Sequence, residues 1–260
     1  MGGVVRMEKE GALGWLFFDH PERRNAISVQ MWRQLPDLVA ELAADDAVRV
    51  VVMRGSGELA FVAGADISEF EQSRSGDSVD GYDVDAGRAM GSLAALTKPV
   101  IAMIHGFCVG GGVGISLTAD LRYAADDAVF AIPAARLGLG YQMAGLETLT
   151  NLVGFSRAKE IFFTARRFDA DEALRMGFLN GVLPKAELEA RVREIAAQMA
   201  QNAPLTLGSV KRIVRELARE PAKRDYAAID DSIQRCFDSE DYKEGVRAFM
   251  EKRTPRFRGQ

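Results

Sequence analysis

The chain has few of the residues that build metal centres, disulfide frameworks or membrane anchors. Among its 260 residues are two cysteines, Cys108 and Cys236, and two histidines, and no CxxC or HExxH spacing occurs. No apolar run approaches the length that spans a bilayer. We therefore expect no metal and no membrane segment. Two reduced thiols and an N-terminus without a signal-peptide pattern predict a cytoplasmic protein.

Basic residues are fewer than acidic ones. The chain carries 33 Lys and Arg against 37 Asp and Glu, which gives a formal net charge of −4. This balance, without a basic and aromatic face, argues against nucleic acid as a partner. The hydrophobic content of 48% is ordinary for a globular chain with a substantial core.

Strand and helix patterns alternate through the first half of the chain. Apolar runs predict strands over residues 12–19, 48–55, 99–106 and 128–133. Ser28 can cap a helix over 29–43, in which Pro36 predicts a kink or a later start. A second helix is expected over 84–96. Residues 71–87, rich in Ser, Gly and Asp, predict a mobile loop between these elements.

From about residue 144 onward the pattern is almost entirely helical. Helices are predicted over 145–153, 156–164, 169–176, 186–201, 204–219 and, with breaks, 221–251. A β/α core followed by a helical end places the chain in the α/β class.

Two glycine-containing stretches stand out, "FVAGADISEF" (61–70) and "CVGGGVGISLTAD" (108–120). Each resembles a turn that leads into a helix, at Asp66 and at residue 113. The first backbone N–H groups of a helix have no partner within it and can bind an oxygen that gains negative charge. Two such donors could form an oxyanion hole, in which each donor contributes about 2.7–4 kcal/mol of transition-state stabilisation.

These stretches belong to a longer set of ordered motifs. The set comprises "HPERRNAIS", "VVVMRGSGELAFVAGADISEF", "KPVIAMIHGFCVGGGVGISLTADLRYAADDAVFAIP", "FTARRFDADEALRMGFLN" and "FDSEDYKEGVRAFMEKRTPRF". With them the chain resembles the crotonase (enoyl-CoA hydratase/isomerase) superfamily over essentially its whole length. The resemblance implies a spiral core of ββα turns over 1–200 and a C-terminal helical region over 201–260 that drives trimerisation.

The resemblance also implies partners and site residues. It implies a coenzyme A thioester as substrate, no metal or redox cofactor, and a homotrimer or a hexamer built as a dimer of trimers. The backbone N–H groups of Ala65 and Gly111 would be the oxyanion donors. The implied CoA contacts are Arg23, Ala26, Ala63, Asp66 and Ile67, with Phe249 and Lys252 reaching CoA from a neighbouring subunit.

The family's two hydratase glutamates are absent. In hydratases they lie two residues beyond the glycine triplet and directly after the Pro of a "P-E-x-x-x-G" segment. Here these positions hold Gly114 and Ala134. Neither side chain can transfer a proton, so hydration or isomerisation by the family mechanism is in doubt.

Tyr141 is a candidate for other chemistry. The pattern "LG-x-x-Y-x-x-x-G" around it resembles methylmalonyl-CoA decarboxylase, although that enzyme has a His where Ala65 stands and keeps a carboxylate near Gly114. Decarboxylation needs no enzymic base, because the leaving carboxylate supplies the electrons. A core-packed ring is the structural alternative for Tyr141. Loop residues Tyr82, Asp83, Asp85 and Arg88 could also replace a lost acid.

Three functions stay open at this point. The first is an acyl-CoA lyase that works through a thioester enolate, with decarboxylation preferred. The second is an enoyl-CoA hydratase or isomerase that uses substituted residues. The third is a pseudoenzyme that binds acyl-CoA without turnover.

Overall fold

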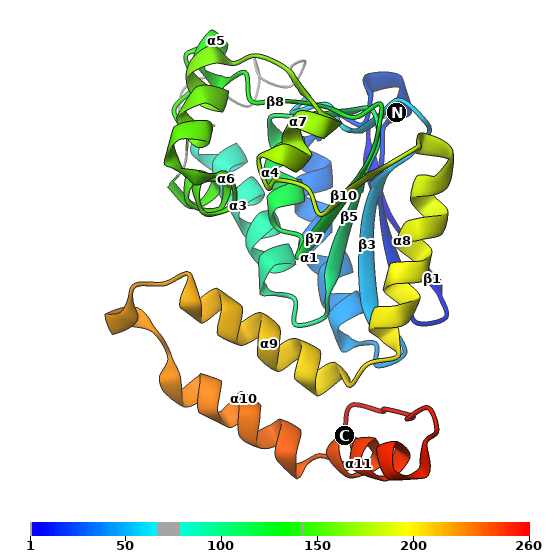
Figure 1. Ribbon diagram of the computed structural model, residues 1–260. Coiled ribbons are helices and arrows are strands. Elements are labelled where there is room, and N and C mark those ends of the chain that lie inside the picture. The colour runs from blue at the N-terminus through cyan, green and yellow to red at the C-terminus, as the bar shows by residue number, and fades with distance from the viewer. Residues whose placement is uncertain (1, 67–78, 142) are drawn as a thin grey trace.

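The computed structural model describes residues 2–66, 79–141 and 143–260 (Figure 1). Its larger sheet has six strands in the order β1-β2-β3-β5-β7-β10. Their bounds are β1 Val4–Glu10, β2 Leu13–Asp19, β3 Val50–Gly55, β5 Val100–Ile104, β7 Leu121–Ala125 and β10 Gly181–Leu183. β1 is antiparallel to β2, and the other neighbouring pairs are parallel. The α/β class is confirmed.

A smaller sheet lies beside the first, in the order β4-β6-β8-β9. Its strands are β4 Ala60–Val62, β6 Phe107–Val109, β8 Val129–Ala131 and β9 Phe168–Asp169. β3, β5 and β7 of the larger sheet are each followed by β4, β6 or β8 of the smaller one, and then by a helix. The helices are α3 Val79–Ala95, α4 Gly111–Leu117 and α5 Ala134–Leu137. This repeated ββα turn is the predicted spiral.

Both faces of the larger sheet are buried, as the continuous apolar run at 48–55 predicts. Alternate side chains of β3 face opposite ways, so that Val51 and Met53 join one core cluster while Val50 and Val52 join another. The first cluster is covered by α1 (Val29–Ala44), α3 and α4. The second is covered by α8 (Lys185–Ala200).

The first helix confirms the predicted cap but not a delayed start. Ser28 Oγ accepts a hydrogen bond from the Met31 backbone N–H at 3.2 Å, and α1 begins at Val29. Pro36 lies inside the helix. The cap and the buried apolar face outweigh the lost backbone hydrogen bond, because Met31, Leu35 and Val39 are all buried.

The predicted loop over 71–87 is wrong from residue 79 onward, where α3 begins. Tyr82, Ala86, Ala89 and Leu93 lie at helical spacing and are buried, and α3 packs against α1. This packed apolar face overrides the poor helix propensity of the intervening Gly and Asp. Residues 71–78 lie outside the described part of the chain, as does the helix predicted to begin just after Asp66.

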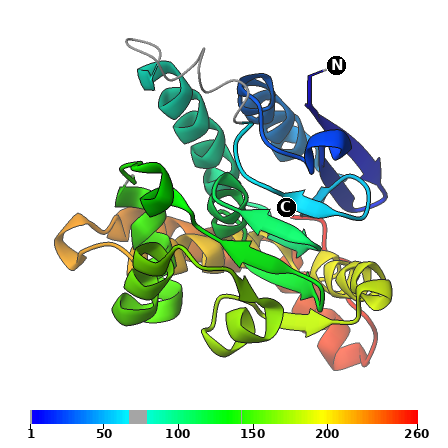
Figure 2. The same cartoon turned by 90° about the horizontal axis from the view of Figure 1, so that it is seen from above.

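The chain from residue 143 onward is mainly helical, as predicted. Its helices are α6 Met143–Thr164, α7 Ala170–Arg175, α9 Pro204–Leu217, α10 Tyr226–Asp238 and α11 Glu240–Glu251. α6 is interrupted at Gly154, which has φ +80°, close to the break predicted between 153 and 156. Figures 1 and 2 show α9, α10 and α11 running beneath the body, from the side of α6 to that of α8. No described helix is long and apolar enough to cross a membrane.

Candidate active site

The "ERRNAIS" turn and the "AGAD" loop are joined through their backbones. Ala63 N–H donates to Arg24 O at 3.1 Å, Ile27 N–H to Gly64 O at 2.8 Å, and Asp66 N–H to Ile27 O at 3.0 Å. This pattern is a short parallel bridge between Ile27 and Ala65. In this bridge Ala65 lies between Gly64, whose O accepts from Ile27, and Asp66, whose N–H donates to Ile27. A residue in that position directs its own N–H to the opposite side of the strand. The Ala65 N–H therefore points away from the turn.

Asn25 holds the turn in place. Its side chain is buried and its backbone has a positive φ of 56°, a conformation that Asn tolerates better than most residues. The side-chain amide donates to Ser56 O at 2.9 Å and to Ala60 O at 2.8 Å, and its Oδ1 accepts from His20 N–H at 3.0 Å. Every partner is a backbone group, so Asn25 fastens the turn to the start of β4.

The glycine triplet brings the second loop against the first. A Cβ on Gly112 would lie 2.1 Å from Val62 O, which leaves no room for any side chain. Gly64 and Gly110 have φ values of +113° and +52°, which favour glycine. Gly110 N–H donates to Ala131 O at 2.9 Å and so fixes the start of α4.

The two predicted donors, Ala65 and Gly111, lie next to each other. A Cβ on Gly111 would be 4.0 Å from Ala65 N. The same point is 3.6 Å from Ile27 Cγ2 and 3.9 Å from Trp32 Cζ2, so these atoms border the hollow above Gly111. Within the described part of the chain neither N–H has a hydrogen-bond partner. The arrangement offers two neighbouring backbone donors to an incoming oxygen.

The positions at which the family's hydratases have glutamates, Gly114 and Ala134, have apolar surroundings. A Cβ on Gly114 would lie 3.4 Å from the sulfur of Met90 on α3, and Ala134 is buried at the start of α5. Trp32 is also buried, and its ring lies 6.4 Å from that of Tyr82 at an interplanar angle of 88°. Sequence reasoning missed Met90 and Trp32, because their roles depend on the packing of α1, α3 and α4.

Tyr141 packs on other apolar side chains just before α6. Its ring lies 4.7 Å from that of Phe162 in an edge-to-face contact. Burial raises the pKa of its phenol, so the hydroxyl is protonated at neutral pH. Among the described residues the hydroxyl has no hydrogen-bond partner. The ring is half-buried against the core, as in the structural alternative, but the hydroxyl lacks the backbone partner of that alternative.

The four residues considered as replacements for the missing acids differ in burial: one is buried and the others lie at or near the surface. Tyr82 is buried against Trp32, on the inner face of α3. Asp85 instead accepts a hydrogen bond from Arg33 Nε at 2.7 Å, an ion pair that links α3 to α1. Asp83 and Arg88 are exposed. The ion pair gives Asp85 a structural task at the surface.

The predicted CoA-binding residues are only partly brought together. Ala26 and Ala63 are half-buried on the two joined loops, and Asp66 is buried. Arg23 is exposed and, within the described residues, forms no ion pair. Ile67 lies outside the described residues.

Phe249 and Lys252 lie at the end of α11, beneath the body, and both are exposed (Figure 1). They are remote from the start of α4 within this chain. Their predicted contact with CoA in a neighbouring subunit stays a prediction.

Sequence and structure comparisons agree on the family. A sequence model described as enoyl-CoA hydratase/isomerase matches residues 8–260. The chain therefore belongs to the enoyl-CoA hydratase/isomerase family, and the resemblance drawn from its motifs is confirmed. The finer likeness to methylmalonyl-CoA decarboxylase stays a prediction.

Named relatives cover nearly the whole chain. A short-chain-enoyl-CoA hydratase from Clostridium acetobutylicum is 34% identical over 251 residues, which is 96% of this chain and 95% of that protein. A carnitinyl-CoA dehydratase from Escherichia coli K12 is 32% identical over 269 residues, with both chains fully covered. The crystal structure of an enoyl-CoA hydratase/carnithine racemase from Magnetospirillum magneticum superimposes with a TM-score of 0.94 at 32% identity, covering 99% of this chain and 96% of that one.

Proposed function

We propose that this protein is an enzyme that acts on an acyl-CoA thioester and stabilises its enolate. The neighbouring, unpartnered N–H groups of Ala65 and Gly111 carry the proposal. As the thioester carbonyl oxygen gains negative charge, two fixed donors stabilise it more in the transition state than in the ground state. The pair thus forms an oxyanion hole.

The reaction that best suits the apolar wall is decarboxylation of a carboxyacyl-CoA. The bond between the α-carbon and the carboxylate breaks, its electron pair forms the enolate, and carbon dioxide leaves. A proton then adds to the α-carbon. Met90 and Ala134 supply no base, and this chemistry needs none. Tyr141 is our candidate hydrogen-bond donor, because its hydroxyl is protonated at neutral pH and has no partner among the described residues.

The second candidate is a hydratase or dehydratase, which the names of the relatives favour. Adding water across a 2,3 double bond requires a base for the water and an acid for the α-carbon. With Gly114 and Ala134 in place, those groups would have to come from other residues. Tyr82 on α3 is the buried candidate.

We further propose how CoA and other copies bind. Arg23 would meet a CoA phosphate, with Ala26, Ala63, Asp66 and Ile67 lining the rest of the CoA. Phe249, 84% exposed on α11, and Lys252 would serve the site of a neighbouring copy. Trimer or hexamer formation is supported by apolar side chains left exposed on all three C-terminal helices. They include Val210, Val214 and Leu217 on α9, Phe237 on α10, and Val246 and Met250 on α11.

The test is a panel of acyl-CoAs read by mass spectrometry. Crotonyl-, 3-enoyl-, methylmalonyl- and glutaconyl-CoA are each incubated with the purified protein and with its Tyr141→Phe variant. Tyr226→Phe, at an exposed tyrosine of α10, is the matched control. We expect carbon dioxide to be lost from a carboxyacyl-CoA, with Tyr141→Phe about 10- to 100-fold slower and Tyr226→Phe unchanged.

Other outcomes of the same panel would assign a different function. Rapid gain of water by crotonyl-CoA would reject the decarboxylase and establish the hydratase. Unchanged masses, with no shift of the 3-enoyl-CoA chromatographic peak, would reject both. Tight acyl-CoA binding in that last case would establish a pseudoenzyme.

A further inference from the structure

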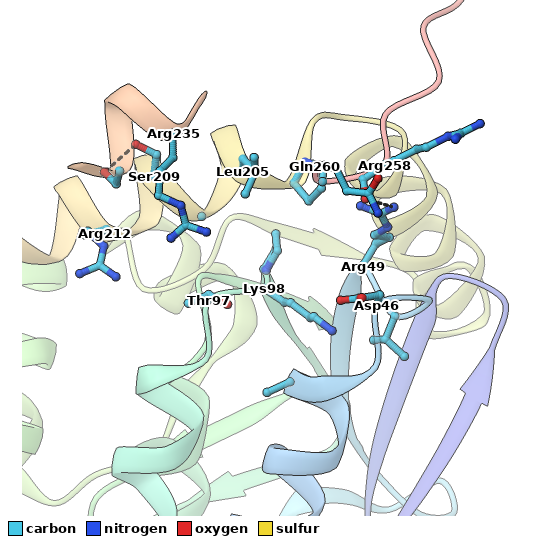
Figure 3. Close-up of a pocket in the computed structure, with 17 residues that line it drawn as sticks. Asp46, Arg49, Thr97, Lys98, Leu205, Ser209, Arg212, Arg235, Arg258 and Gln260 are labelled. Atoms are coloured by element: carbon cyan, nitrogen blue, oxygen red, sulfur yellow. Dashed lines mark hydrogen bonds between the residues drawn. The ribbon is translucent and has the colours of Figure 1, made fainter. Parts of the chain in front are cut away.

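A cavity lies at the opposite end of the larger sheet from the glycine loops. It has a volume of about 290 Å³ and lies between the base of the core and the C-terminal helices (Figure 3). Arg49 and Pro99, which line it, immediately precede β3 and β5. Ala65 and Gly111 instead follow β4 and β6, the strands that come after β3 and β5 in the chain. The cavity is therefore separate from the candidate active site, and its volume is near the lower end of ligand sites.

Positive side chains line this cavity from three parts of the chain. Arg49 and Lys98 belong to the core, Arg212 to α9 and Arg235 to α10. Figure 3 shows Arg212 and Arg235 reaching from the helices toward the segment of Thr97 and Lys98.

None of these four cations forms an ion pair among the described residues, although Asp46 and Asp45 lie near Lys98. Arg49 donates to the backbone carbonyl of Arg258 at 3.2 Å, and Lys98 Nζ donates to Leu42 O at 2.7 Å and Asp45 O at 2.6 Å. Carbonyls bear no net charge, so these contacts do not cancel the positive charges. Burial lowers the pKa of Lys98, and the nearby Asp46 and Asp45 partly offset that effect. Arg212 and Arg235 have neither a hydrogen bond nor an ion pair among the described residues.

The acids present are too few to balance them. Asp46 is the one acidic side chain among the described lining residues, and Gln260 contributes a backbone oxygen. Gln260 O already accepts hydrogen bonds from Glu240 N–H at 2.7 Å and Asp241 N–H at 3.3 Å, at the start of α11. By contrast, the nearby Lys211 has its own acid, Asp120, at 2.6 Å. Unpaired cations facing one hollow, in a chain of net charge −4, favour an anion there.

We propose that this cavity binds a small anion with two phosphate groups, held by Arg212 and Arg235 on one side and by Arg49 on the other. A guanidinium pairs with phosphate through two parallel hydrogen bonds, and several such pairs match a multiply charged ligand. Since its ligands come from the core and from α9 and α10, the bound anion ties the C-terminal helices to the core. Binding should therefore raise the unfolding temperature.

The test uses the full chain with inorganic pyrophosphate as the probe, followed by titration calorimetry and thermal unfolding. Sulfate at equal ionic strength controls for general screening. We expect saturable pyrophosphate binding that the double variant Arg212→Ala/Arg235→Ala weakens about tenfold or more. Both side chains are exposed, so the variant should fold. Arg175→Ala is the matched control, because Arg175 is also exposed and forms no ion pair among the described residues.

Three results would overturn the proposal. One is equal stabilisation by pyrophosphate and sulfate with no loss in the double variant, which means screening alone. Another is loss of binding in Arg23→Ala but not in the double variant, which moves the pyrophosphate to the proposed CoA site. The third is no binding together with a changed sedimentation mass of the double variant, which means that another copy of the chain fills the cavity. None depends on the proposed enzymic activity.

Discussion

The two sides of the candidate active site differ in what they are made of. One side is backbone: the N–H groups of Ala65 and Gly111, held by Gly112, which has no room for a side chain, and by the positive φ of Gly64 and Gly110. The other side is made of side chains, and there Gly114 and Ala134 occupy the positions of the two hydratase glutamates, with Met90 beside Gly114. The part that we propose to bind an oxyanion is kept, and the positions of the two glutamates are changed.

This difference has a physical basis. A backbone donor depends on the path of the chain, and here that path is set by tight contacts such as Gly112 against Val62. A side-chain acid can be replaced without moving the chain, as long as its space is filled. Met90 borders that space beside Gly114. One fold can therefore keep its oxyanion site while its proton chemistry changes.

The largest effect should come from Gly112→Ala. Its Cβ would lie 2.1 Å from Val62 O, and both groups belong to backbone that cannot move without breaking the smaller sheet. We expect loss of folded protein at ordinary temperature, measured by circular dichroism and thermal unfolding. Gly114→Ala is the control, because its Cβ would meet only the flexible Met90 side chain at 3.4 Å. Equal stability of the two variants would contradict the described junction.

Gly111→Ala should separate activity from stability. Its Cβ would have no contact closer than 3.6 Å, so the protein should fold normally. The added methyl group would nevertheless occupy the hollow beside Ala65 N–H and exclude the thioester oxygen. We expect turnover to fall by about 100-fold or more, with an unfolding temperature close to that of the parent. Parent-like kinetics on the reactive acyl-CoA would rule out the proposed oxyanion hole.

Restoring the missing acids tests the side-chain half of the site. We expect the double variant Gly114→Glu/Ala134→Glu to gain crotonyl-CoA hydration by about tenfold or more, because the carboxyl groups can then activate water. Some stability should be lost, since Met90 must move and position 134 is buried. Gly114→Gln/Ala134→Gln matches the shape without the proton transfer. The hydration rates of the two double variants are compared, and equal rates would show that position 114 or 134 is not at the reacting carbon.

The smallest effect concerns Tyr141 and pH. Burial raises its pKa above the ordinary value of about 10, so the folded state favours the protonated phenol. This contribution to stability is fully present below pH 10 and is lost as the pH rises from there through the folded-state pKa. The unfolding free energy of the parent relative to Tyr141→Phe should therefore be constant from pH 7 to about 10 and fall above it. A change between pH 7 and 9 would contradict the assignment.

Much of the fold could be predicted from the chain alone. The run at 48–55 had to be a strand buried on both faces, and Ser28 had to cap the following element, because both signals are local. The glycine loops could also be predicted, because three consecutive glycines indicate a tight turn before a helix. The motifs indicated the family. Gly114 and Ala134 showed that the usual acids were absent.

Packing decided the rest. Residues 79–87 look like a loop by composition, yet they are helical because Tyr82 and Ala86 find an apolar partner in α1. The sulfur beside Gly114 and the indole beside Gly111 come from elements distant in sequence. The cation-lined cavity likewise needs the core, α9 and α10 to meet. Local sequence indicates most of the elements, whereas the helix over 79–87 and the contacts between distant elements depend on how buried faces fit together, and only the tertiary structure contains that information.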